Sequence, residues 1–320
     1  MKKIVTMFLA AVLLATATAA SAAPAKISVS QFVEHPALNA IAKGFKDDLQ
    51  ENGVAAEYKE YNANGNMGTA GQIATQIASD GPDLILAIAT PSAQACAKAY
   101  EKAPQLANTP MLFTGITDPL AAGLVKDYQK PGPNITGVSN QMPMEKHLQM
   151  LRRVLPKLAS LGVLYNSGEV NSVSNVKRLK EAAAKMNITV LDGPATNTAD
   201  VFQAAQSLVG KVDALFVPTD NTVVSALEAV IKVCEKTRLP LFSADTDSVK
   251  RGTIAAMGFD YYQHGKQTGA MARKILAGAK PEDLPVEFQK DLVFHVNPKA
   301  AERMGLTLEK AIIDSANTLY

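Results

Sequence analysis

From residue 26 onward the sequence alternates between short apolar runs and longer segments with a helical period. The first apolar run covers residues 27–32, and Leu38, Ile41, Phe45 and Leu49 then recur at every third or fourth position, which is the spacing of one helix face. The pattern further predicts strands at 54–61, 84–89 and 111–114 and helices at 69–79 and 92–100. Strands that alternate with helices of this length are typical of parallel βαβ units that are covered on both faces.

The same order of elements occurs a second time. Strands are predicted at 161–165, 189–191, 214–217 and 241–243, and helices at 174–186, 200–209 and 222–235. Residues 83–92 align with residues 213–222 at an offset of 130, and Pro110 aligns with Pro240 at the same offset. The first strands of the two copies are 134 residues apart. Matches in one consistent order predict an α/β protein of two similar open lobes, each with a parallel sheet.

The two lobes are expected to exchange chain segments. A Pro-Gly-Pro-Asn segment at 131–134 is the predicted linker, and it leads into a strand at 135–139. A strand at 252–258 and a helix at 262–276 follow the second copy and fit no third copy, so the chain is predicted to return to the first lobe. We predict a first lobe of residues 26–138 and 257–289 and a second lobe of 139–256 and 290–320. Several crossings form a hinge, and two lobes on a hinge enclose a cleft.

Composition and charge restrict the function. A chain of 320 residues has the length of about two domains. The 32 basic residues balance 30 acidic ones, which argues against a nucleic-acid partner. Two cysteines, Cys96 and Cys234, are too few for a disulfide scaffold or a four-thiolate zinc site. They either pair in an oxidising compartment or pack as small buried hydrophobes.

The N-terminus has the pattern of an export signal. Lys2 and Lys3 precede an apolar run, and the small residues Ala20-Ser21-Ala22 follow it, as in a signal peptide of residues 1–22 that is cleaved near Ala22. An uncleaved membrane anchor is the alternative, but the apolar run is shorter than the roughly 20 residues that span a bilayer. No cysteine precedes Cys96, so no lipid attachment motif is expected. We predict a periplasmic protein that is not inserted in the membrane after cleavage.

Residues at the strand ends are the candidate site, because ligands of open parallel sheets bind beyond the carboxyl ends of the strands. In the first copy these ends offer hydroxyls and amides, at Thr90, Ser92, Thr114, Thr117 and Asn140. A helix start with free N–H groups and hydroxyls favours an anion. The second copy adds carboxylates and more amides, at Asn166, Glu169, Asn171, Asp220, Asn221 and Asp245. Opposite walls of this kind fit a zwitterion such as an α-amino acid, although each Thr, Ser, Asp or Asn among these residues is also a common helix N-cap.

Aromatic residues near the strand ends are candidates for an apolar wall. They are Phe32, Tyr165, Phe259, Tyr261 and Tyr262. Packing in the core is the alternative role for each of them.

Catalytic motifs are missing from the sequence. It contains no His-Glu-x-x-His, Gly-x-Ser-x-Gly or Walker lysine pattern, each of which marks a known kind of active site. The four histidines are scattered, which disfavours a His-rich metal site. We therefore expect no catalytic residue, no metal and no cofactor.

The strand ends also carry a resemblance to a known family. The stretches are Ala89–Gln94, Thr114–Pro119, Tyr165–Ser172, Pro218–Thr222 and Gly258–Tyr262. They resemble the ABC-transporter substrate-binding family that includes tryptophan- and tyrosine-type binding proteins, over about Ile27 to Leu308. The resemblance implies the type I periplasmic-binding fold, in which two Rossmann-like lobes joined by a three-strand hinge close on a small ligand.

The resemblance also implies roles for single residues. The turn at Thr90 and Ser92, together with Thr117, would hold a ligand carboxylate, and Asp220 with Asn221 would hold its ammonium. Glu169, Asn171 and Asp245 would line the wall of the second lobe. Some family members bind aromatic amino acids, and Phe and Tyr are the only large aromatic residues of this chain, which lacks Trp.

The expected mechanism is capture of the ligand without chemistry. Closure of the lobes buries the ligand, and an ABC permease with a cytoplasmic ATPase recognises the closed form. One alternative is a sensor that presents the closed form to a membrane receptor. A second is a periplasmic enzyme that uses Glu169, Asp220 or Asp245 as acid and base. A monomer is expected, because no heptads or extensive apolar stripe indicate an assembly.

Overall fold

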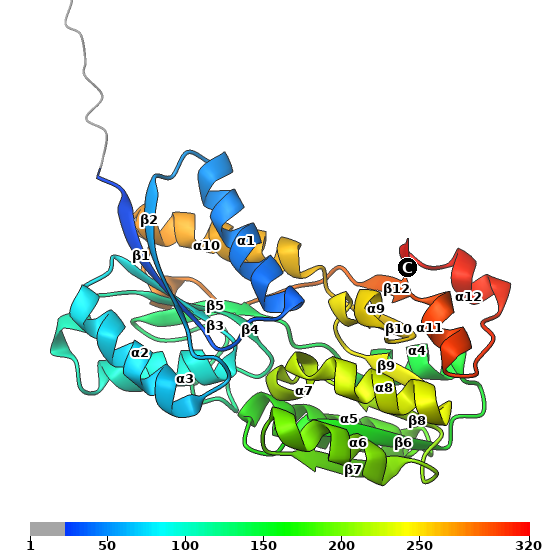
Figure 1. Ribbon diagram of the computed structural model, residues 1–320. Helices are drawn as coiled ribbons and strands as arrows, with labels where there is room; N and C mark the ends of the chain where they lie inside the picture. Colours follow the sequence, from blue (N-terminus) through cyan, green and yellow to red (C-terminus); the bar gives the residue numbers. More distant parts are fainter. Residues whose placement is uncertain (1–22) are drawn as a thin grey trace, which may run out of the picture.

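Buried apolar side chains of the protein form two separate cores, one in each of two lobes (Figure 1). The structure is a computed structural model that describes residues 23–320. The predicted signal peptide lies outside the described residues.

The first lobe is built on a six-stranded parallel sheet with the order β11-β5-β4-β3-β1-β2. Its strands are β1 (Ala25–Gln31), β2 (Ala56–Asn62), β3 (Leu84–Ile88), β4 (Met111–Ile116), β5 (Ile135–Ser139) and β11 (Glu287–Phe288). Its helices are α1 (Pro36–Glu51), α2 (Met67–Asp80), α3 (Thr90–Tyr100) and α10 (Tyr261–Leu276), with short 3-10 turns η1 (Pro104–Leu106) and η3 (Pro281–Asp283). Helices α1 and α10 pack together on one face of the sheet, and α2 and α3 pack together on the other (Figure 1).

Two glycines allow α1 and α10 to cross at backbone contact. A Cβ at Gly265 would lie 2.1 Å from the carbonyl oxygen of Ile41, and a Cβ at Gly44 would lie 2.1 Å from the carbonyl oxygen of Tyr262. Neither position therefore accepts a side chain without a shift of the helices. The crossing fixes the start of α10, which carries Tyr261, against the first lobe.

The second lobe repeats the strand order of the first. Its strands β6 (Ser160–Asn166), β7 (Thr189–Ala195), β8 (Ala214–Val217) and β9 (Leu241–Ser243) form a parallel sheet with the order β7-β6-β8-β9. The first lobe has the corresponding order β2-β1-β3-β4, so the predicted duplication is confirmed in the topology. Asp83 and Asp213, which align at the offset of 130, accept the backbone N–H of Lys26 and Ser160 at 2.8 and 2.7 Å. Each aspartate thus ties the strand that follows it to the first strand of its own lobe.

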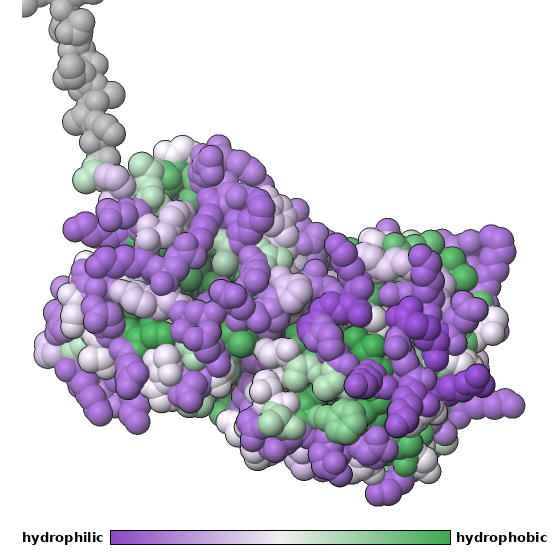
Figure 2. Space-filling model, in the orientation of Figure 1, coloured by the Kyte–Doolittle hydropathy of each residue, from purple (hydrophilic) through white to green (hydrophobic). Residues whose placement is uncertain are grey.

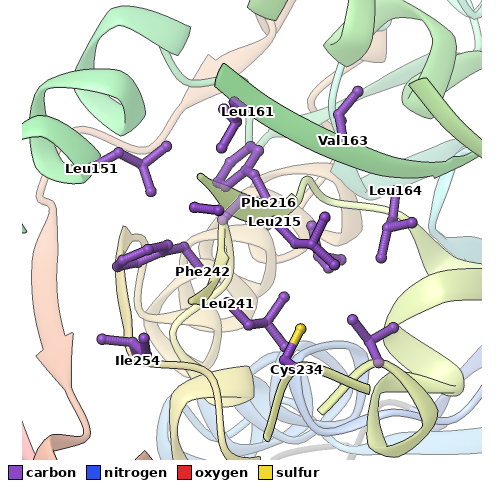
Figure 3. Packing of buried hydrophobic residues seen from close by; sticks show 14 of the residues in the cluster. Leu151, Leu161, Val163, Leu164, Leu215, Phe216, Cys234, Leu241, Phe242 and Ile254 are labelled. Carbon is purple, nitrogen blue, oxygen red and sulfur yellow. The ribbon is translucent and has the colours of Figure 1, made fainter. Parts of the chain in front are cut away.

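Helices cover both faces of the second sheet and enclose its core. Helices α4 (Met144–Val154) and α5 (Val170–Lys185) pack together, as do α6 (Val201–Leu208) and α8 (Leu227–Thr237). Between them Leu161, Phe216 and Phe242 are fully buried (Figure 3). The helix predicted at 222–235 is split in two, because α7 (Asn221–Ser225) ends at Ala226 before α8 begins. The remaining elements are η2 (Thr198–Asp200), α9 (Asp247–Arg251), α11 (Pro298–Arg303) and α12 (Lys310–Asp314).

The chain passes between the lobes three times, as the resemblance implies. The passages follow β5, lie between β10 (Ala255–Gly258) and α10, and lie between β11 and β12 (Val293–Val296). Strands β10, β12 and β13 (Thr318–Leu319) form a small mixed sheet beside the second core. Residues 257 and 258 therefore lie with the second lobe and Ser139 with the first sheet, each on the other side of the predicted boundary, while the remaining lobe boundaries stay a proposal.

One linker prediction is wrong. Residues 131–134 lead into β5, and β5 pairs in parallel with β4 inside the first sheet. The chain leaves the first lobe only after Ser139. The proline-rich segment leads into β5, which lies between β4 and β11 in that sheet, so its composition indicates a turn and not a domain boundary.

Both cysteines are buried and free. Cys96 packs in the first core and Cys234 in the second, so they are small core residues and not a disulfide. Among residues 23–320 no helix combines the length and the hydropathy that a bilayer crossing requires. The face drawn in Figure 2 is mostly hydrophilic.

Candidate functional site

A narrow cavity lies between the two lobes at the carboxyl ends of their strands. The volume open to the centre of a water molecule is about 30 Å³. The first lobe and the hinge contribute His35, Ala37, Leu38, Gly115, Thr117, Asn140 and Tyr261, and the second lobe contributes Asn171, Thr219, Asp220, Asn221, Val224 and Asp245. Seven of these are residues that the sequence predicted: Thr117, Asn140, Asn171, Asp220, Asn221, Asp245 and Tyr261.

Two hydrogen bonds join the lobes directly beside this cavity. The hydroxyls of Thr117 and Thr219 lie 3.1 Å apart, and Ser174 donates to Asp118 at 2.7 Å. Each pair has one member after β4 in the first lobe and one in the second lobe. The structure is therefore a closed form in which the lobes touch.

Glu169 supports the wall of the second lobe from behind. Its carboxylate accepts the Nδ2 of Asn221 at 2.5 Å, the hydroxyl of Thr222 at 2.8 Å and the backbone N–H of Thr222 at 3.2 Å. It also accepts the side chain of Asn171 at 3.2 Å. Glu169 itself is not among the residues that line the cavity. Its charge neutralises the start of α7 and fixes the amides that face the cavity.

Asp220 lines the cavity and is also the N-cap of α7. It accepts the backbone N–H groups of Val223 and Asn166 at 2.7 and 2.5 Å and the hydroxyl of Ser172 at 2.6 Å. Burial, reinforced by the charge of Glu169, raises the pKa of the Asp220 carboxyl. Removing this side chain would leave three buried donors without an acceptor, so Asp220 supports the fold as well as lining the cavity.

Asp245 accepts fewer hydrogen bonds than Asp220, the other carboxylate that lines the cavity. It accepts only from Ser248, whose N–H lies at 2.9 Å and whose hydroxyl lies at 2.7 Å. Burial raises the pKa of Asp245. Its remaining acceptor capacity is available to a donor that enters between the lobes.

Several buried polar atoms around the cavity have no partner among the described residues. Two are amide oxygens of residues that line the cavity, Oδ1 of Asn140 and Oδ1 of Asn171. The Nδ1 of His35 is a third. Burial and the charge of Arg251 lower the pKa of His35 to about 4, so its ring is neutral at pH 7. Buried polar groups are rarely left unpaired in proteins, and such groups at a cavity mark a ligand site.

The start of α3 carries two further unpaired hydroxyls. Thr90 and Ser92 are buried, and neither Oγ1 of Thr90 nor Oγ of Ser92 has a partner among the described residues. Ala89, the residue before the helix, has φ 73° and ψ 152°, a conformation that costs a non-glycine residue free energy and is found at ligand sites. Its N–H donates to the carbonyl of Thr114 at 3.1 Å. The turn is thereby held beside the end of β4, just before Gly115 and Thr117 reach the cavity.

The other predicted residues are not among those that line the cavity. Phe32 is part of the first core, and Thr114 bonds to Thr268 of α10 at 2.8 Å. Tyr165 packs against the second core, and Asn166 bonds to Thr222 at 2.7 Å. Thr90, Ser92 and Glu169 are buried and do not line the cavity. Of the remaining aromatic candidates, Phe259 is buried outside the lining, and Tyr262 donates to Asp47 on the first lobe.

Sequence reasoning missed His35 and Thr219. His35 directly precedes Pro36, the first residue of α1, and Thr219 directly precedes Asp220. Both positions follow the end of a strand, which was the rule used for the other candidates. The position at a strand end is therefore the signal that could have identified both residues, whereas an imidazole or a threonine hydroxyl carries no charge signal of the kind that marks Asp220 and Asp245. Among residues 23–320 no cluster of His, Cys, Asp and Glu is placed to hold a metal ion.

Two lobes on a three-passage hinge, with a polar cavity at the facing strand ends, define a two-lobed ligand-binding protein. A family model described as ABC transporter substrate binding protein matches residues 26–319. The match spans nearly all of the described chain, so the chain belongs to the ABC transporter substrate-binding proteins. The predicted family and the predicted fold class are both confirmed.

Relatives of known description lie within this family. A tyrosine-binding protein of Clostridioides difficile is 39% identical over 268 residues, which are 81% of this chain and 75% of the relative. A Streptococcus pneumonia protein solved in complex with L-Trp is 33% identical, with a TM-score of 0.88 and coverage of 93% and 100% of the two chains. The ligand-free, open structure of a Clostridium difficile substrate-binding protein with adhesive properties is 38% identical, with a TM-score of 0.69 and coverage of 92% and 98%.

Proposed function

We propose that this protein is the exported binding component of an ABC importer and that it captures an aromatic α-amino acid between its lobes. The lobes close on the ligand, and the closed form delivers it to a membrane permease with a cytoplasmic ATPase. The observation that carries the proposal is the pair of buried carboxylates, Asp220 and Asp245, in the cavity of the closed form.

The second-lobe wall is suited to an ammonium group. No lysine or arginine is among the described residues that line the cavity, so a cation from outside is the natural partner of Asp220 and Asp245. An ammonium has three donors, and the unpaired oxygens of Asn140 and Asn171 lie in the same lining. Carboxylates whose pKa burial has raised gain most from a cation that favours their ionised form.

The first-lobe wall is suited to a carboxylate. Thr117 lines the cavity just after β4, and the unpaired hydroxyls of Thr90 and Ser92 are at the N-terminus of α3, whose first turn lies beside the end of β4. A helix N-terminus attracts negative charge. An α-amino acid presents both charges within one molecule, so it bridges the two lobes.

The apolar part of the lining favours an aromatic side chain. Tyr261 and His35 supply rings, and Leu38 and Val224 supply aliphatic surface. Relatives that bind tyrosine and L-Trp support the same class of side chain. Rings of this kind pack edge to face or offset against one another.

Closure is supported by the two solved relatives together. The chain is more identical to the open, ligand-free relative than to the relative with L-Trp, yet its TM-score is 0.69 against the first and 0.88 against the second. Sequence divergence alone would give the opposite order. A rigid rotation of lobes about a hinge lowers a whole-chain score in this way.

Capture without catalysis also fits the carboxylates. The carboxylate oxygens of Glu169 and Asp220 accept hydrogen bonds from backbone and side-chain donors of the second lobe. These bonds give both carboxylates a part in building the second-lobe wall, and relatives of this chain are described as a tyrosine-binding protein and a substrate-binding protein. We therefore favour the binding protein over the periplasmic enzyme.

Calorimetric titration with L-tyrosine, L-tryptophan and L-phenylalanine tests the proposal. We expect micromolar or tighter binding of at least one, which corresponds to about −8 kcal/mol. The amine without the carboxylate and the acid without the ammonium should each bind far more weakly. X-ray scattering should show a smaller radius of gyration with the ligand. Superimposable scattering profiles and no heat with any of the three amino acids would reject the proposal.

A further inference from the structure

A row of three polar side chains joins the second lobe to the first-lobe wall of the cavity. Asn175 on α5 is buried, and its Nδ2 lies 2.7 Å from Oγ1 of Thr219. That hydroxyl lies 3.1 Å from Oγ1 of Thr117 in the other lobe. Both threonines line the cavity, whereas Asn175 stands behind them.

The hydrogen bonds in this row have a preferred direction. The Nδ2 of Asn175 also lies 3.5 Å from the carbonyl oxygen of Thr219, which accepts only, so the amide nitrogen faces Thr219. The Thr219 hydroxyl therefore accepts from Asn175. A hydroxyl that accepts one hydrogen bond becomes a better donor of another, which favours Thr219 as the donor in its contact with Thr117. The proton of Thr117 is then left for an acceptor in the cavity.

We propose that Asn175 is a positioning residue that turns the Thr117 hydroxyl toward the carboxylate of the ligand when the lobes close. The inference rests on the proposed function, and it adds a residue that touches no ligand. Thr117 and Thr219 belong to different lobes, so the row is complete only in the closed form. The carboxylate thus gains a stronger donor on closure, and by the same coupling it stabilises the closed form.

The substitution Asn175→Asp tests the direction of the row. It replaces the donor with an acceptor, so Thr219 must donate to the new carboxylate and Thr117 must donate to Thr219. No hydroxyl proton then remains for the ligand. Because a hydrogen bond to a charged group contributes about 1.5–3 kcal/mol, affinity for L-tyrosine or L-tryptophan should fall roughly tenfold or more. Affinity for tyramine or tryptamine, which lack the carboxylate, should change less than about twofold because the lost bond is absent there.

Two further substitutions separate this role from a structural one. Thr219→Val removes the hydroxyl that orients Thr117 but leaves the Thr117 proton free, so a selective loss smaller than that of Asn175→Asp is expected, and Thr219→Ser, which keeps the hydroxyl, should recover it. Ser174→Ala is the matched control, because it removes the other bond between the lobes, to Asp118, without touching the row. It should weaken the amino acid and the amine by the same factor.

Thermal melts show whether each variant is folded. If Asn175→Asp does not fold, the comparison of Thr219→Val with Thr219→Ser tests the proposal instead. Equal losses for acid and amine in the folded variants, or no loss, would overturn the positioning role while leaving the proposed function intact. Failure of the unaltered protein to bind any of the amino acids would instead overturn the proposed function, and the positioning role with it.

Discussion

Replacing Asp245 with asparagine is expected to separate recognition of the ammonium from the stability of the fold. Asp245 accepts from the N–H and the hydroxyl of Ser248 and from no other described residue. The asparagine oxygen can still accept from the N–H of Ser248. Its Nδ2 donates to the Ser248 hydroxyl, which then accepts a hydrogen bond instead of donating one. The fold should therefore survive Asp245→Asn with an unchanged or higher melting temperature, since a buried carboxylate is replaced by a neutral amide.

The loss of affinity follows from the charge that is removed. Two unit charges 4 Å apart attract by about 4 kcal/mol at an effective dielectric constant near 20, which sets an upper bound. A hydrogen bond to a charged group contributes about 1.5–3 kcal/mol and a neutral one about 0.5–1.5 kcal/mol. Because the amide oxygen still accepts a neutral bond, the affinity for the amino acid should fall by roughly 10- to 100-fold.

Calorimetry of both proteins with L-tyrosine and with 3-(4-hydroxyphenyl)propionate measures this loss. The second compound lacks the ammonium, so its binding should be unchanged or tighter in Asp245→Asn. Asp247→Asn is the matched control: Asp247 is two residues away but is not among the residues that line the cavity. An Asp245→Asn protein that binds the amino acid within about twofold of the original would refute the reasoning, because even one weakened hydrogen bond exceeds that factor.

Three further outcomes are expected. Affinity for an amino acid should rise with pH and level off above the raised pKa values of Asp220 and Asp245, because the ammonium binds their ionised forms. Calorimetric titrations at pH 6 in buffers of different ionisation enthalpy should show that binding releases protons. Proton uptake on binding would contradict this expectation. Gly265→Ala should lower the free energy of unfolding in urea by about 1–3 kcal/mol through overpacking, whereas Gly71→Ala, with open space around it, should raise it by about 0.5–1 kcal/mol. Burial raises the pKa of Cys96 and of Cys234 to about 12, so both thiols should react with Ellman's reagent only after unfolding, and fast reaction of the folded protein would contradict their burial.

The architecture was predictable because its signals are local. Parallel strands that are buried on both faces read as continuous apolar runs, such as 84–88 and 214–217, and the helices between them have a clear period. The helix α4 has the same kind of period, at Leu148, Leu151 and Val154, but it follows the linker region and was not predicted. Strand β13 at the C-terminus pairs with β12, and such a pairing leaves no local signal.

The site was predictable only as a set of strand ends. The expectation that ligands bind beyond the carboxyl ends of strands correctly predicts Asp220 and Asp245 in the cavity. It does not distinguish a carboxylate that caps a helix from one that is available to a ligand. Glu169 shows the difficulty: it precedes α5 as a cap would, yet it binds the start of α7, 52 residues further along the chain. That contact depends on how β6 and β8 lie side by side, which is a property of the folded lobe.

The duplication itself explains why the two walls differ in charge. Position 90 aligns with position 220, and position 92 aligns with 222, so each pair stands at the start of a helix that follows equivalent strands. A helix start attracts negative charge in both copies. In the second lobe the chain supplies that charge itself, since Asp220 accepts from Val223 and Glu169 accepts from Thr222. In the first lobe Thr90 and Ser92 bring hydroxyls without charge, and these have no partner among the described residues. One copy of the same local structure therefore carries no charge at its helix start, while the other carries carboxylates, and this difference supports the proposed ligand with opposite charges at its two ends.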